Sequence, residues 1–115
     1  MEVEIKRDGL TLRGLYEKVS DHIVILSHGF SANYTYYDGL SEELNRNGFS
    51  TLRFDFNGHG RSDGEQTDMN VMNECLDLMA VIKYVKSLGY RHISLVGQSQ
   101  GGVVTSMAAG YYSDT

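Results

Sequence analysis

The stretch Leu95–Val104, LVGQSQGGVV, places a serine between glycines at the end of an apolar run. An apolar run followed at once by such a turn and then by small residues is typical of a strand that passes abruptly into a helix. Gly97 and Gly101, two residues before and two after Ser99, leave space for the two chain segments to approach closely. Ser99 is therefore a candidate nucleophile, held clear of its own backbone at the start of a helix.

Ser99 also has a purely structural interpretation, because serine is a frequent N-cap whose hydroxyl accepts a hydrogen bond from the first turn of a helix. A GxSxG match alone is a weak signal, since glycine and serine are common residues. The context favours the catalytic interpretation: a strand is predicted before the serine, a helix after it, and an HGF turn at residues 28–30 follows an earlier apolar run.

Acyl transfer by a serine also needs hydrogen-bond donors aimed at the developing oxyanion. The backbone N–H of Gln100 lies in the first turn of the predicted helix, where N–H groups have no partner within the helix. Gly29 allows the chain to turn so that the backbone N–H of Phe30 faces the same point. We therefore predict an oxyanion hole made by Phe30 and Gln100.

The pattern of apolar residues predicts the fold around this turn. Alternation over residues 2–19, interrupted by Asp8-Gly9, predicts an antiparallel hairpin. The run 23–26 predicts a strand buried on both faces. Further elements follow along the chain: a helix over 37–48, a strand over 49–56, a helix over 69–88, a strand over 92–96 and a helix over 101–112.

Both middle helices have apolar residues at helical spacing, which predicts the faces that they bury. In the first helix the predicted inner residues are Tyr37, Leu40 and Leu44; in the second they are Met72, Cys75, Leu76, Met79, Ile82 and Val85. Gly48 and Gly89 are predicted C-terminal caps, and Asp68 is a predicted N-cap. The coarse prediction is an α/β fold, ββαβαβα, with a mostly parallel sheet and an antiparallel amino-terminal hairpin.

The motifs SHGF, FDFNGHGRSDG and LVGQSQGGVV, together with residues 68–97, make the chain similar to the α/β-hydrolase superfamily over essentially its whole length. More narrowly it resembles the bacterial feruloyl (cinnamoyl) esterases. The resemblance implies a serine hydrolase that acts on esters of hydroxycinnamic acids, with Ser99 as nucleophile and the backbone N–H groups of Phe30 and Gln100 as oxyanion hole. It implies no metal and no organic cofactor. It also places the strand that ends at Ser27 beside the strand that ends at Val96.

The chain departs from this family in two ways. Gln98 stands where such esterases often have histidine, and we interpret it as structural. In this fold the serine precedes the acid and the histidine along the chain, yet after Ser99 the sequence has only Asp114 and no histidine. We therefore expect residues 1–115 to be the amino-terminal portion of a single α/β-hydrolase domain, with the later strands, the lid, the acid and the histidine absent from it.

The remaining histidines, carboxylates and tyrosines have structural interpretations. The resemblance gives neither His28 nor His59 the role of base, and His22 and His92 are expected to be solvated turn residues. Asp55 is expected to hold the loop that contains Arg61 and Asp63. Cys75 is expected to behave as a small buried hydrophobe. The three tyrosines 34, 36 and 37 are expected chiefly to pack, although they are also candidates for the entrance to a site.

Composition excludes several classes of function. The formal net charge is −5 and the basic residues are scattered, which argues against a nucleic-acid partner. The amino terminus does not have the pattern of a secretory signal, and no apolar run is long enough to cross a membrane, so we expect a cytoplasmic protein without a membrane partner. One cysteine rules out an internal disulfide, and no cysteine or histidine pair has metal-ligand spacing.

Two interpretations from different classes remain open. In the first, the chain is part of a carboxylesterase for a small ester and is nearly inactive alone; short-chain acyl esters or monoacylglycerols are alternative substrates. In the second, it is a non-catalytic binding or assembly module. The strand over 92–96 is expected at an exposed sheet edge, so a second copy of the chain or the missing carboxy-terminal half would have to cover it.

Overall fold

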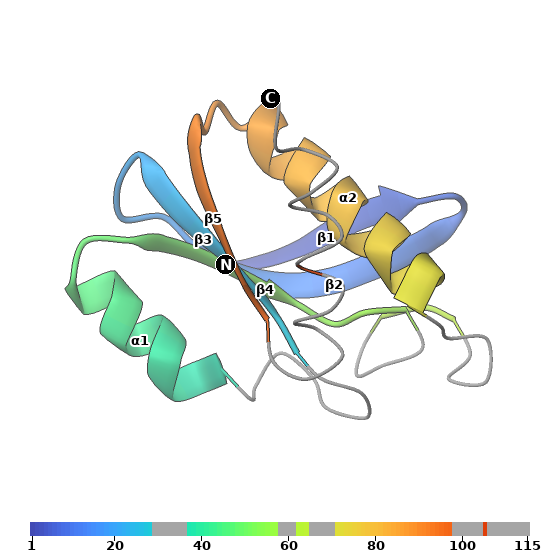
Figure 1. Cartoon of the computed structure of the whole chain (residues 1–115), viewed down its shortest axis with the longest axis horizontal. Coiled ribbons are helices and arrows are strands. Elements are labelled where there is room, and N and C mark those ends of the chain that lie inside the picture. The colour runs from blue at the N-terminus through green and yellow to red at the C-terminus, as the bar shows by residue number, and fades with distance from the viewer. Residues whose placement is uncertain (29–36, 58–61, 65–70, 98–104, 106–115) are drawn as a thin grey trace.

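A computed structural model describes residues 1–28, 37–57, 62–64, 71–97 and 105. Within these residues the chain forms the elements drawn in Figure 1: β1 Glu2–Arg7, β2 Leu10–Glu17, β3 His22–Ser27, α1 Asp38–Arg46, β4 Ser50–Phe54, α2 Val71–Ser87 and β5 His92–Gly97. Three strands therefore precede the first helix, whereas the predicted order ββαβαβα has only two strands there. The helix predicted over 101–112 and the N-cap predicted at Asp68 lie outside the described residues.

The strands form one mixed sheet in the order β1-β2-β4-β3-β5. The hairpin β1–β2 is antiparallel, and β2 also runs antiparallel to β4. Strand β3 is parallel to both of its neighbours, β4 and β5. The α/β fold with an antiparallel amino-terminal hairpin is therefore confirmed, and so is the predicted adjacency of the strands that end at Ser27 and Gly97.

The hairpin turns at Asp8-Gly9, as predicted. Both residues have positive φ, 47° at Asp8 and 84° at Gly9. Two consecutive residues of positive φ suit the right-handed twist of the flanking strands, and aspartate and glycine are the residues that adopt this conformation at least cost.

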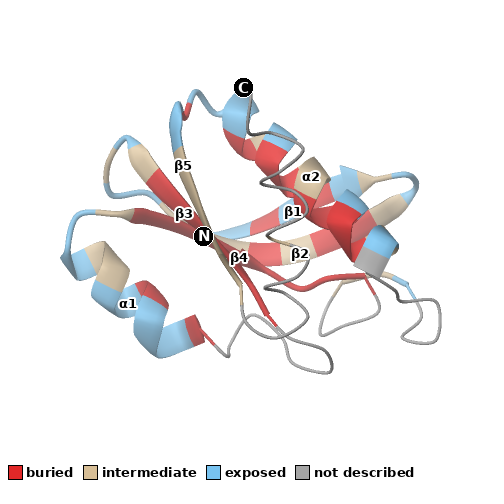
Figure 2. Ribbon diagram, viewed as in Figure 1, coloured by how far each residue is buried: buried red, intermediate tan, exposed pale blue. Residues whose placement is uncertain are grey.

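The two helices cover opposite faces of the sheet. Strand β3 alternates between them: Ile23 and Ile25 belong to a large apolar cluster with α2, while Val24 and Leu26 belong to a small one with Tyr37 and Leu44. The run 23–26 is buried throughout, as expected of a central strand (Figure 2).

The inner face of α2 differs from the predicted one. Met72 and Leu76 are 62% and 41% exposed, whereas the acidic residues Glu74 and Asp77 are buried. The rest of the prediction is confirmed, because Cys75, Ile82 and Val85 are buried and Met79 packs against the core, where Leu78 and Val81 join them. Apolar spacing alone misplaced the face because polar contacts made by Asp77 bring a carboxylate inward.

A similar correction applies to α1. Leu40 is 43% exposed, and the residue of the helix that is buried is Ser41, whose hydroxyl lies 3.0 Å from that of Thr51 on β4. Tyr37 and Leu44 do pack on the sheet as predicted. Gly48 and Gly89, the predicted caps, have φ of 89° and 98°, so both adopt the left-handed conformation that ends a helix.

Candidate active site

The three predicted catalytic positions, Ser99, Gln100 and Phe30, lie outside the described residues, as do Gln98 and His59. The structure does describe the strands that lead to them. Ser27, the last residue of β3, pairs in parallel register with Gly97, the last residue of β5. The segments that carry Phe30 and Ser99 therefore leave neighbouring positions at the carboxyl edge of the sheet, which is where open α/β sheets bind ligands.

His28 is fixed between two strands. It is 1% exposed, and its Nε2 accepts a hydrogen bond of 3.1 Å from the backbone N–H of Phe56. Its ring also meets the Phe56 ring edge-on, with centroids 4.9 Å apart. Because Nε2 accepts this hydrogen bond, the proton of the neutral imidazole is on Nδ1. This structural use agrees with the expectation that His28 is not the base for Ser99.

Tyr37 anchors the start of α1 to the same edge. Its hydroxyl donates a buried hydrogen bond of 2.9 Å to the backbone carbonyl of Ser27, and the residue is 4% exposed. The expectation that this tyrosine packs is thus confirmed. Tyr34 and Tyr36, the other two tyrosines of that segment, lie outside the described residues.

The segment after β4 forms hydrogen bonds with β2 both before and after residues 58–61. The Asp55 N–H donates to the Arg13 carbonyl at 2.9 Å, and the Ser62 hydroxyl accepts from the Arg13 N–H at 2.7 Å. Asp63 accepts from the Thr11 N–H and from the Arg13 guanidinium. The hydrogen bond from Arg13 lowers the pKa of Asp63 most, and the bond from the Thr11 N–H lowers it further. Asp63 therefore holds this segment to β2, while Asp55, the carboxylate predicted to hold the loop, is buried.

A buried ion pair joins this segment to α2, and no pattern in the sequence predicts it. Asp77 is fully buried; one carboxylate oxygen accepts from Arg7 Nε at 2.9 Å, and the other accepts from the Asn57 backbone N–H at 2.8 Å and from its side-chain amide. Burial raises the pKa of Asp77, while these bonds oppose the rise. A lone aspartate within a helix is normally solvated, so only its partners, distant in sequence, reveal its role.

His22 was wrongly expected to be a solvated turn residue. It begins β3, its Nε2 lies 2.7 Å from the Ser94 hydroxyl on β5, and its ring meets Phe49 edge-on. His92 begins β5 and is exposed, as expected. Cys75 is buried, and burial raises the pKa of its thiol, as suits a small core residue.

The described part of the chain contains no group of three or more histidine, cysteine, aspartate or glutamate residues that would suit a metal ion. Neither of its helices is both long and apolar enough to cross a membrane.

Residues 18–115 match a family of proteins described as serine aminopeptidase, S33. The chain belongs to this family of α/β hydrolases. A carboxylesterase of Bacillus subtilis is 33% identical over 94 residues, which are 82% of this chain and 38% of that protein. A 2-(acetamidomethylene)succinate hydrolase of Mesorhizobium japonicum is 31% identical over 97% of this chain and 38% of its own length.

Solved structures of esterases have the same fold. Est1E of Butyrivibrio proteoclasticus, in a structure with ferulic acid bound, superposes with a TM-score of 0.91 at 31% identity, over 97% of this chain and 48% of Est1E. An esterase of Pyrococcus furiosus superposes with a TM-score of 0.83 at 31% identity, over 91% of this chain and 44% of that one. The chain thus spans less than half the length of these relatives and is similar to their amino-terminal part.

Proposed function

We propose that the chain carries the nucleophile and the oxyanion hole of a carboxylic ester hydrolase. Ser99 attacks the ester carbonyl, and the N–H groups of Phe30 and Gln100 hold the resulting oxyanion. The observation that carries the proposal is the parallel register of Ser27 with Gly97, because it starts both segments side by side at the carboxyl edge of the sheet. Family membership and the esterases among the relatives support it.

The chemical step divides into acylation and deacylation. The Ser99 oxygen bonds to the acyl carbon as the alcohol leaves, and water then releases the acid and frees the serine. In this fold the acid and the histidine that relays the proton follow the serine along the chain, and no histidine follows Ser99 in residues 1–115. We therefore propose that activity needs further residues and that 1–115 alone is nearly inactive.

The proposed substrates are hydroxycinnamoyl esters. The structural likeness to Est1E, solved with ferulic acid bound, favours this class over short-chain acyl esters or monoacylglycerols. Comparing rates on methyl ferulate and p-nitrophenyl butyrate is the direct test of this choice.

The test of the nucleophile uses the longest product of the gene that encodes this chain. A fluorophosphonate probe should label that protein stoichiometrically, and Ser99→Ala should abolish labelling and reduce ester hydrolysis by at least about 10⁴-fold. Ser87→Ala is the matched control, because this hydroxyl sits at the exposed end of α2 and donates only to the Tyr84 carbonyl. Labelling that survives Ser99→Ala would refute the proposal. Rapid hydrolysis by residues 1–115 alone would refute the claim that further residues are needed.

A further inference from the structure

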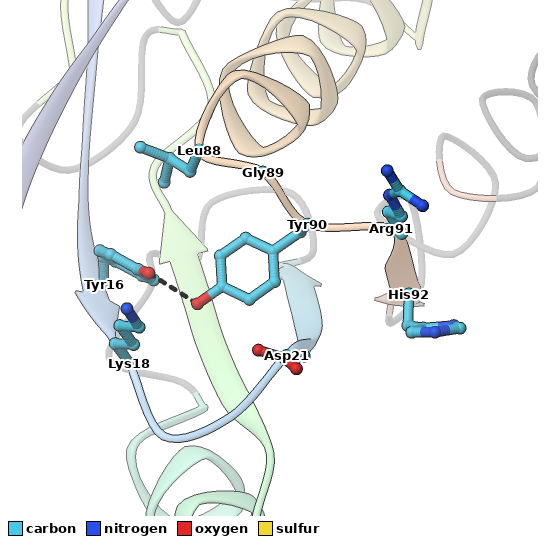
Figure 3. Close-up of a pocket in the computed structure, with 8 residues that line it drawn as sticks. All are labelled: Tyr16, Lys18, Asp21, Leu88, Gly89, Tyr90, Arg91 and His92. Carbon is cyan, nitrogen blue, oxygen red and sulfur yellow. Dashed lines mark hydrogen bonds between the residues drawn. The ribbon is translucent and has the colours of Figure 1, made fainter.

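A polar pocket lies where β3 and β5 begin, at the opposite end of these strands from Ser27 and Gly97. It has a volume of about 360 Å³, and its lining includes Tyr16, Lys18, Asp21, Tyr90 and Arg91 (Figure 3). The lining comes from the end of β2, the β2–β3 connection, the connection between α2 and β5, and the start of β5. The volume is within the range of small-molecule sites, and several distant segments converge on it.

Two tyrosines form the fixed part of the pocket. The hydroxyls of Tyr16 and Tyr90 lie 2.6 Å apart, and the rings meet edge-on with centroids 6.3 Å apart. Tyr16 stands on a strand paired on both sides, and Tyr90 is only 9% exposed. The two hydroxyls are therefore held in place before any ligand binds.

This pair presents one hydrogen-bond donor. Two phenols carry two protons, and a single hydrogen bond between them uses one, so the accepting hydroxyl keeps a proton for a third group. Burial and the Tyr90 hydroxyl raise the pKa of Tyr16, so this phenol keeps its proton at neutral pH. The surplus O–H thus suits an acceptor atom of a ligand.

The charges around the pair favour an anionic acceptor. Lys18 and Arg91 carry positive charge, and Asp21 opposes one of them, so the lining is net positive in a chain whose formal charge is −5. Figure 3 shows Lys18 beside the hydroxyl pair and Arg91 beyond the Tyr90 ring. A charge-assisted contact with lysine together with a phenol donor is a common way to bind carboxylate or phosphate oxygens.

We propose that this pocket binds a small oxyanion, held by Lys18 and the surplus hydroxyl of the Tyr16–Tyr90 pair, with Arg91 adding positive charge. The site is separate from the proposed active site and does not depend on it. Its ligand is a carboxylic acid or a phosphate ester small enough for the pocket volume.

The test is a titration of the ¹⁵N-labelled protein with inorganic phosphate and, separately, with succinate, followed by amide chemical shifts. Shifts should concentrate on residues 16–21 and 88–92, with dissociation constants on the order of millimolar. Binding of phosphate alone assigns phosphate esters and binding of succinate alone assigns carboxylic acids; either result supports the proposal.

Two variants that each remove one positive charge distinguish binding in the pocket from general attraction of the anion to the protein. Lys18→Met should weaken binding about five-fold or more, while Lys83→Met, which removes an exposed lysine of α2 outside the pocket, should change it less than about two-fold. Tyr90→Phe should also weaken binding, since the Tyr16 hydroxyl keeps its proton but loses the partner that holds it in place. Equal effects of the two lysine variants, or no shifts up to about 20 mM of either anion, would overturn the proposal.

Discussion

The two faces of the sheet are built by different means. Toward α2 the strands present Leu12, Ile23, Ile25, Leu52 and Phe54, which pack with the helix into one large apolar cluster. Toward α1 the apolar cluster is small, and polar pairs fill much of the contact: Ser41 with Thr51, and Arg53 with Asp38 and Glu17. Strand β4 contributes to both, because its buried residues alternate between the faces.

This difference teaches that burial by itself does not identify the stabilising interaction. Thr51 and Leu52 are adjacent and both fully buried, yet one makes a hydrogen bond and the other makes apolar contacts. Removal of an apolar side chain leaves a cavity, whereas removal of the Thr51 hydroxyl leaves Ser41 and Asn45 with other hydrogen-bond partners and therefore costs less. We therefore expect the α2 face to contribute more to stability.

The largest expected effect comes from this adjacent pair. Leu52→Ala should lower the free energy of unfolding by about 3 to 4 kcal/mol, since it leaves a cavity in the larger cluster. Thr51→Ala should lower it by about 1 to 2 kcal/mol through the lost bonds to Ser41 and Asn45. Urea denaturation monitored by circular dichroism measures both. Equal costs would break the comparison of the two faces.

Two aspartates that pair with arginine give the next comparison. Asp77→Ala should cost about 3 kcal/mol, because it removes the partner of the nearly buried Arg7 guanidinium and of the Asn57 amide. Asp38→Ala should cost about 1 kcal/mol or less, because this carboxylate is 64% exposed even though its partner Arg53 is mostly buried. Chemical denaturation of the two variants is the measurement, and a larger cost for Asp38→Ala would contradict the structure.

Thiol labelling compares how often each helix separates from the sheet. Cys75 is buried and its pKa is raised, so iodoacetamide should modify it only when the α2 face opens. A cysteine introduced by Ser41→Cys on the shorter helix should react about ten-fold faster or more, because less apolar contact holds α1 to the sheet. Leu40→Cys, at an exposed position, serves as the unprotected reference. Peptide mass spectrometry separates the two sites, and equal protection would show that both faces open together.

The smallest expected effects test which residues face outward. Leu40→Ala and Leu76→Ala should each change stability by about 0.5 kcal/mol or less, because both leucines are more than 40% exposed. Leu78→Ala should lower the free energy of unfolding by about 2 to 4 kcal/mol, because Leu78 is fully buried in the large cluster. Thermal melts of the three variants suffice. A large loss of stability in Leu76→Ala would mean that Leu76 is buried, as apolar spacing predicts, and would contradict the structure.

Much of the fold could be predicted because its signals are local. The Asp8-Gly9 turn, the buried run 23–26 and the glycines that end both helices are each set by backbone conformation or by continuous burial, which a short segment determines by itself. The neighbouring placement of the strands before Phe30 and Ser99 came from family resemblance, and the structure confirms it. The roles of Ser99, Phe30 and Gln100 stay predictions.

The sequence by itself determined the order of the described strands and helices, the turn at Asp8-Gly9 and the glycines that follow the two helices. Only the tertiary structure decided which helix faces are inward and which polar groups are buried: Asp77 with Arg7 and Asn57, Ser41 with Thr51, and His28 with Phe56. The physical reason is that a buried polar group is stable only beside its partner, and here most of these partners lie far away in the sequence. Apolar spacing contains no information about such pairs.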